Sequence, residues 1–104
     1  MVNPNLHNSR AQESRLAEKF GGRRTPGSGN QWHSKNDVRT DNWSFEAKTT
    51  SKKQYTLKAQ ELETGEKYAL LDGKTFAFVI EMNGREWVTI AMEDFELLKE
   101  EAGA

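Results

Sequence analysis

The chain has 104 residues, of which 30% are charged and 35% are hydrophobic, and its formal net charge is −1. This length suits one domain with one modest core, and the aromatic content of 10% argues against wholesale disorder. No apolar run approaches the roughly 20 residues of a membrane span, and the N-terminus lacks the apolar segment of a signal peptide. Because there is no cysteine, a disulfide framework and a thiolate zinc site are excluded, and we expect an intracellular, cytoplasmic protein without a membrane partner.

The charge is distributed unevenly along the chain. Residues 1–60 carry eleven Lys and Arg against five Asp and Glu, a balance of +6, whereas residues 61–104 carry four against eleven, a balance of −7. The first part would attract a polyanion, and the second part would repel one. Two solvated charged surfaces are the simpler alternative, but the basic residues crowd the segment that holds the candidate catalytic residues. This coincidence favours nucleic acid as the partner.

The first predicted element is a helix over residues 9–20. Ser9-Arg10-Ala11-Gln12 fits the capping-box pattern of a helix start, and Gly21-Gly22 ends the helix. Residues 1–8 are then expected to form a flexible N-terminus.

Three short strands are expected next. Residues 22–32 predict a short strand and then a loop, and residues 36–39 and 43–49 predict two strands joined at Asp41-Asn42. A two-residue turn there would pair Val38 with Phe45 and set Asp37 directly across from Glu46, on the same face of the sheet. Like charges placed directly opposite each other destabilise a sheet, and a divalent cation between them would remove the conflict.

The remaining chain predicts a helix and a hairpin. The helix begins after Thr56 and reaches Leu71, although Gly65 weakens it enough to allow a break. Residues 75–82 are almost continuously apolar, which is typical of a strand covered on both faces. Asn83-Gly84 is a strong hairpin signal, and residues 85–91 form the returning strand.

A last helix is expected over residues 93–102, with Met92, Phe95, Leu98 and Ala102 facing inward. The predicted fold class is therefore α/β (α+β), a single domain over residues 1–104. A small mixed sheet is flanked by helices, in the order αβββαββα.

The segment Phe45-Glu46-Ala47-Lys48 carries the clearest chemical pattern. Side chains alternate between the faces of a strand, so Glu46 and Lys48 point to the face opposite Phe45 and Ala47. Asp37 and Glu46 offer the hard oxygen ligands that suit Mg²⁺ or Mn²⁺, and the carbonyl of Ala47 adds a third. Lys48 would orient the attacking water or steady the developing negative charge. A solvent-exposed Glu46–Lys48 pair on an edge strand is the alternative.

Glu13 is a candidate outer ligand of the same cluster. It precedes Leu16 and Phe20 by three and seven residues, so it lies on the apolar face of its helix and needs a partner inside the protein. Pairing with Arg10, Lys19 or a distant arginine is the alternative role.

These motifs, in this order, resemble the PD-(D/E)XK nuclease superfamily. The matching parts are the helix with Glu13, the Gly27-Ser28-Gly29-Asn30 loop, Asn36-Asp37-Val38, and Phe45-Glu46-Ala47-Lys48-Thr49-Thr50. Within the superfamily the chain is most similar to the Holliday junction resolvases of archaea and phages. The resemblance covers residues 9–60 by motif and the rest only by element order. One departure is Asn36, which precedes the aspartate where many members have proline.

The resemblance implies a restriction-endonuclease-like core and a catalytic set of Glu13, Asp37, Glu46 and Lys48. Asp37 and Glu46 would be the metal ligands, and Gln60 would be a possible accessory residue. Ser28 would sit in a loop near the substrate backbone, although the glycine-rich loop is equally well explained as a simple turn. The residues expected to contact DNA are Arg23, Arg24, Ser28, Gly29, Asn30, Lys35, Lys52 and Lys53, with a solvated surface as an equal competitor for the cations.

The function expected from the sequence is a Mg²⁺-dependent endonuclease that cleaves branched DNA, most simply a Holliday junction resolvase. A four-way junction needs two symmetric cuts and one short chain offers one active site, so a homodimer is expected. The alternatives are a nuclease of the same superfamily that acts on flaps, nicks or ends, a non-catalytic DNA-binding module, and a small interaction protein with an acidic C-terminal face.

Overall fold

The structure is a computed structural model that describes residues 4–25 and 36–103. Its elements follow one another as helix, three strands, helix, two strands and helix, so the predicted α/β class and element order are confirmed. Their bounds are α1 (Pro4–Phe20), β1 (Arg23–Arg24), β2 (Val38–Arg39), β3 (Trp43–Thr50), α2 (Ala59–Leu71), β4 (Thr75–Met82), β5 (Arg85–Thr89) and α3 (Met92–Glu101).

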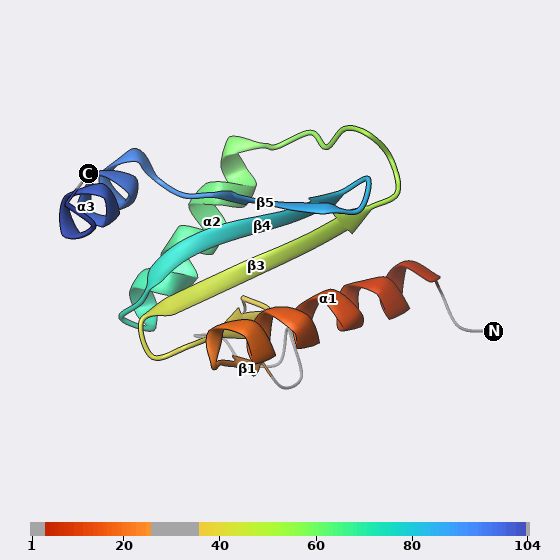
Figure 1. The fold of residues 1–104 in the computed structure, drawn as a ribbon, viewed down its shortest axis with the longest axis horizontal. Coiled ribbons are helices and arrows are strands. Elements are labelled where there is room, and N and C mark those ends of the chain that lie inside the picture. The colour runs from red at the N-terminus through yellow and green to blue at the C-terminus, as the bar shows by residue number, and fades with distance from the viewer. Residues whose placement is uncertain (1–3, 26–35, 104) are drawn as a thin grey trace.

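The strands form one mixed sheet in the order β1-β2-β3-β4-β5. Strands β3 and β4 are parallel, and the other neighbours are antiparallel. A parallel pair needs a crossover connection, which here contains α2 (Figure 1). The predicted pairing of Val38 with Phe45 is confirmed, and the Thr40 N–H donates to the Trp43 carbonyl across the two-residue turn at a distance of 2.9 Å.

Helices α1 and α2 cover opposite faces of the sheet. Leu16 of α1 packs into a core cluster with Phe45 and Ala47 of β3, while Ala69 of α2 packs with Phe76 and Phe78 of β4. The five residues from Phe76 to Ile80 are all buried, because β4 is covered from both sides as its apolar run predicts. Strand β3 differs from β4, since its α2-facing side carries Ser44, Glu46 and Lys48.

Helix α2 is continuous through Gly65, so the break that the sequence allowed does not occur. The glycine lets the helix approach the sheet, because a Cβ atom at this position would lie 2.2 Å from Phe76 Cζ. Asn36 stabilises this packing of α2 on the sheet. Its side-chain amide donates to the Gly65 carbonyl at 2.9 Å and to Ser44 Oγ at 2.8 Å. This buried amide explains why an asparagine stands before Asp37.

The first helix begins at Pro4 rather than at Ser9, which corrects the predicted start. Residues 4–8 are helical and not a flexible tail, and the capping-box motif lies inside the helix. Proline is well suited to the first turn of a helix, since the N–H that it lacks has no partner there. The end of α1 is as predicted: Gly21 has a left-handed backbone (φ 66°), and the Gly22 N–H donates to the Ala17 carbonyl at 2.7 Å.

The predicted inward face of the last helix is wrong. Within Met92–Glu101 no residue is buried, and the exposed fractions of Met92, Phe95 and Leu98 are 65%, 52% and 40%. The physical reason is position, because α3 follows the edge strand β5 and lies beyond one end of the sheet instead of over a face (Figure 1). In the described part of the chain, no helix is long and apolar enough to span a membrane.

Gly65→Ala tests the close packing of α2 on β4. Alanine favours a helix over glycine by up to about 1 kcal/mol, so without a clash the variant would be more stable. The clash with Phe76 is expected to dominate and to lower the free energy of unfolding by about 1–3 kcal/mol. Urea unfolding measures the change. Glu66→Ala, at the exposed neighbouring position, is the control and should change stability by no more than about 0.5 kcal/mol. A variant more stable than the wild type would contradict the packing.

Candidate functional site

Asp37 occupies the point where the β2–β3 ladder stops. Strand β2 begins at Val38, so the N–H of Ala47 on β3 has no strand residue opposite it. The Asp37 carboxylate takes this position and accepts the hydrogen bond from Ala47 N at 2.9 Å. The Asp37 carbonyl in turn accepts from the Thr25 N–H at 2.8 Å. Both the backbone and the carboxylate of Asp37 are thereby held against β3.

Glu46 lies beside Asp37, as the predicted register requires, because the Asp37 carboxylate is bound to the N–H of the residue that follows Glu46. Burial and then Asp37 raise the pKa of Glu46 to about 9, against its ordinary value of 4.5. The Lys48 ammonium and the Ala47 N–H act in the opposite direction but are weaker. In the absence of a cation, Glu46 therefore keeps its proton at neutral pH.

The carbonyl of Ala47 is directed toward the same side of β3 as Asp37. A strand residue that faces an antiparallel neighbour presents its N–H and its C=O to that neighbour together. Since the Ala47 N–H points to Asp37, its carbonyl oxygen lies on the Asp37 side as well. Two carboxylates and one backbone carbonyl thus converge at the edge between β2 and β3.

Gln12 of α1 fixes the backbone at Lys48, and sequence reasoning missed it. Its side chain is fully buried, and Nε2 donates to the Lys48 carbonyl at 2.9 Å. Among the described residues, Gln12 Oε1 is a buried atom without a hydrogen-bond partner. The sequence spacing could have indicated that Gln12 is buried, because Gln12 stands four residues before the core residue Leu16 and therefore lies on the same face of the helix. The Lys48 side chain is exposed, while its backbone carbonyl is held by the buried Gln12 side chain.

Glu13 neighbours this cluster but has its own partner. Its carboxylate pairs with Arg24 of β1 at 3.4 Å, which is the distant-arginine alternative that the sequence left open. Burial first, and then the nearby Asp37, raise the pKa of Glu13, while Arg24 lowers it. Arg24 is therefore paired with Glu13 of α1 instead of standing alone as a candidate DNA contact.

A cleft of about 390 Å³ opens beside Glu46 and Lys48. Gln60, predicted only as a possible accessory residue, lines this cleft together with both of them. Tyr55, in the segment between β3 and α2, donates from its hydroxyl to Glu61 at 2.7 Å. Burial, and to a lesser extent Glu61, raises the pKa of Tyr55. The lining residues that sequence reasoning missed are Lys58, Glu61, Thr64 and Phe78. For Thr64, the sequence spacing could have indicated this position, because Thr64 follows Gln60 by four residues and both therefore lie on one face of α2.

The predicted DNA contacts are placed unevenly. Arg23 is exposed on β1, and Lys52 and Lys53 are exposed in the segment after β3. Ser28, Gly29, Asn30 and Lys35 lie outside the described residues.

The donor set at Asp37 and Glu46 fits Mg²⁺. Across residues 4–25 and 36–103, no group of three His, Cys, Asp or Glu side chains forms a metal site, since Glu13 stays with Arg24 and leaves a pair of carboxylates. Mg²⁺ is usually bound through one or two carboxylates, with waters and substrate phosphates completing its coordination. Asp37, Glu46 and the Ala47 carbonyl would hold the ion in this way.

In comparisons with known proteins, no protein-family model, no curated protein and no solved structure matches this chain. The resemblance to the PD-(D/E)XK nucleases therefore stays a prediction from motifs.

The raised pKa of Glu46 predicts a stability that falls as pH rises. Below pH 4.5 the group is protonated in both the folded and the unfolded chain; between 4.5 and about 9 only the unfolded chain loses the proton. The free energy of unfolding should then fall by up to about 1.4 kcal/mol per pH unit from this group, and level off above pH 9. Glu46→Gln should remove this slope, as measured by urea unfolding in EDTA from pH 5 to pH 9.

Glu18→Gln, at an exposed position of α1, is the matched control and should keep the wild-type slope. A Glu46→Gln variant with an unchanged slope would show that Glu46 does not hold its proton in the folded protein.

Proposed function

We propose that this protein is a metal-dependent endonuclease that cleaves phosphodiester bonds in branched DNA. The observation that carries the proposal is the Asp37–Glu46 pair: the Asp37 carboxylate is bound to the N–H of Ala47, next to Glu46, and Glu46 and Lys48 line an open cleft. Such a pair is poor at holding two negative charges by itself, because the carboxylates repel each other in a half-buried place. A divalent cation would displace the Glu46 proton and bind both carboxylates.

Each residue has a defined task in this chemistry. A bound Mg²⁺ would polarise the phosphodiester and lower the pKa of a coordinated water. Asp37 and Glu46 would bind the cation at the β2–β3 edge. Glu46 must lose its proton before it can bind the cation. Lys48, on the same face of β3, donates to the phosphate oxygens as negative charge develops and the P–O bond to the leaving oxygen breaks. Gln60 faces the same space from α2 and orients the attacking water or the phosphate.

The substrate class follows from charge and from the resemblance to resolvases. The catalytic half of the chain carries the balance of +6, so recognition is by phosphate contacts and shape, without base readout. A four-way junction presents two equivalent strands for cutting, which requires two active sites and favours a two-fold dimer.

A β5–α3 apolar surface is suited to a second copy of the chain. Strand β5 is an edge of the sheet, and four of its five residues are exposed. Edge strands present unpaired backbone groups, and an antiparallel pairing of β5 with β5 of a second copy about a two-fold axis would satisfy them. The exposed apolar residues of this surface are Trp87 and Val88, which lie on opposite faces of β5, and Met92, Phe95, Leu97 and Leu98 of α3.

A cleavage assay tests the proposed activity. The wild type with Mg²⁺ should cut a four-way junction at paired positions near its centre, and should cut a flap and a linear duplex much less. Glu46→Ala and Lys48→Ala should each lower the single-turnover rate by about 100-fold or more while junction binding persists. Glu18→Gln should keep the wild-type rate.

The other outcomes separate the alternatives. Equal cutting of junction, flap and duplex would overturn the resolvase assignment and indicate another nuclease of the superfamily. Binding without cutting, with Mg²⁺ and with Mn²⁺, would indicate a non-catalytic DNA-binding module. Binding insensitive to salt would argue against phosphate recognition altogether.

The dimer is tested by Phe95→Glu, which places a charge in the β5–α3 apolar surface. The wild type should sediment as a dimer at micromolar concentration, and the variant should sediment as a monomer. Leu70→Glu makes the same change at an exposed position of α2 outside this surface and should leave the dimer intact. A wild type that stays monomeric at all concentrations would contradict the assignment of this surface to a second copy.

A further inference from the structure

Arg23 and Arg39 form a cross-strand pair of like charges. They are directly opposite each other in the antiparallel β1–β2 ladder. Directly opposite residues project to the same face with Cβ atoms roughly 5 Å apart, and like charges in this arrangement are destabilising. The backbone there is close-packed as well, since a Cβ atom on Gly22 would lie 2.4 Å from the Arg39 carbonyl oxygen. The fold therefore sets two arginines directly across from each other at the β1–β2 edge.

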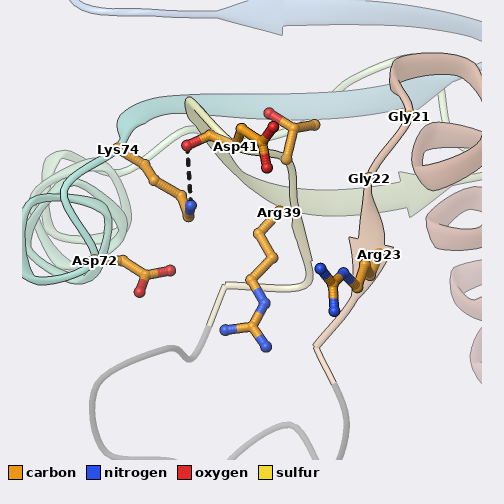
Figure 2. Close-up of a pocket in the computed structure, with 8 residues that line it drawn as sticks. Gly21, Gly22, Arg23, Arg39, Asp41, Asp72 and Lys74 are labelled. Carbon is orange, nitrogen blue, oxygen red and sulfur yellow. Dashed lines mark hydrogen bonds between the residues drawn. The ribbon is translucent and has the colours of Figure 1, made fainter.

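Lys74 joins the two arginines from a distant part of the chain. It lies between α2 and β4, and its Nζ donates to the Asp41 carbonyl at 3.1 Å. Figure 2 shows the Arg23 and Arg39 side chains extending on the same side of the strands, with Lys74 and Asp72 across the hollow from Arg23. We call this hollow the Arg23–Arg39–Lys74 pocket. Its full lining is Gly21, Gly22, Arg23, Arg39, Thr40, Asp41, Asp72 and Lys74.

The charge and size of the pocket suit a phosphate group. Three cations and two aspartates line it, so a net positive charge remains when the carboxylates are counted. Its volume is about 230 Å³, so a phosphate group fits in it. Guanidinium groups match phosphate oxygens in paired hydrogen bonds, and a phosphate between Arg23 and Arg39 would offset their repulsion.

The pocket lies on the same sheet face as the carboxylate pair. Arg39 is opposite Ser44 in the β2–β3 ladder, and Ser44 shares its face with Glu46 two residues further along β3. The backbone positions of Ser44 and Glu46 are about 7 Å apart along β3, and Arg39 lies one strand away from Ser44. A DNA strand carries one phosphate per about 3.4 Å of helix axis, so a strand whose scissile phosphate is at Glu46 has another phosphate within reach of the pocket.

We propose that the Arg23–Arg39–Lys74 pocket binds a backbone phosphate of the nucleic acid, a few nucleotides from the phosphate at Asp37 and Glu46. The pocket fixes the register of the strand at the catalytic residues and takes no part in bond breaking. This inference rests on the proposed function for the identity of the ligand. The sequence indicated Arg23 as one of several surface cations, but not Arg39 or Lys74, and Lys74 belongs to the acidic part of the chain.

The test is the salt dependence of DNA binding in EDTA, with a labelled four-way junction as the probe. Arg23→Gln and Arg39→Gln should each weaken binding by about tenfold at low salt and reduce the slope of log K against log salt by about 1. The loss should be the same for any base sequence. Arg23→Lys keeps the charge and should retain most of the slope. Lys67→Gln, at an exposed position of α2, is the matched control and should leave the slope unchanged.

A second measurement identifies the phosphate itself. Neutral methylphosphonates are placed singly along the junction strands. At the position that faces the pocket, the substitution should weaken binding by the wild type but should not weaken binding by Arg39→Gln any further. Unfolding midpoints within about 0.5 M urea of the wild type show that the variants are folded.

A free phosphate compound is the other source of the same chemistry. Inorganic phosphate is titrated into the wild type while the amide signals of Gly22 and Thr40 are followed by NMR. Saturation of these signals, together with unchanged salt slopes in both arginine variants, would overturn the nucleic-acid assignment in favour of a small phosphate ligand.

The readouts separate this inference from the proposed activity. A wild type that cuts junctions while both arginine variants keep its salt slope would overturn the pocket and leave the nuclease intact. Pocket-dependent binding without cleavage under any metal would support the pocket and overturn the nuclease.

Discussion

The candidate site depends on the burial of one face of strand β3 beneath helix α2. Strand β3 is interior to the sheet, and its pleat sends Phe45 and Ala47 into the α1-side core and Glu46 toward the α2 side. Glu46 is therefore desolvated by the fold itself, and its neighbour Asp37 adds a second carboxyl group in the same place. A group in this position must share a proton or bind a cation. The same packing that stabilises the sheet thus creates the chemistry proposed for its edge.

Asp37 serves both the fold and the site. Its carboxylate satisfies the Ala47 N–H that β2 is too short to reach, and this bond also brings it against Glu46. Gln12 acts in a similar way from the opposite face, where it holds the Lys48 carbonyl from within the α1 interface. The backbone that carries Glu46 and Lys48 is consequently held by two side chains, Asp37 and Gln12. Sites built on such supported strands keep their geometry better than sites on loops.

Part of this arrangement could be predicted because it depends on local patterns. The two-residue turn at Asp41-Asn42 sets the β2–β3 register, and the register alone puts Asp37 opposite Glu46. The Asn83-Gly84 turn and the apolar run of β4 were equally clear, and Asn83 adopts a left-handed backbone as such a turn requires. The start of α1 was missed because the capping-box motif at Ser9 competes with the proline at position 4, and the tertiary contacts of α3 cannot be read from its amphipathic spacing.

By itself, the sequence determined the order of the elements, the faces of β3 and the pairing of two carboxylates, because strand alternation and short turns act over a few residues. Tertiary structure decided the rest. Only the packing of α2 on β4 brings Gln60 to the Glu46 cleft, and only the meeting of β1, β2 and the α2–β4 connection gathers Arg23, Arg39 and Lys74. The pKa of Glu46 and the exposure of α3 likewise depend on what covers each residue, and that depends on contacts between segments far apart in the chain.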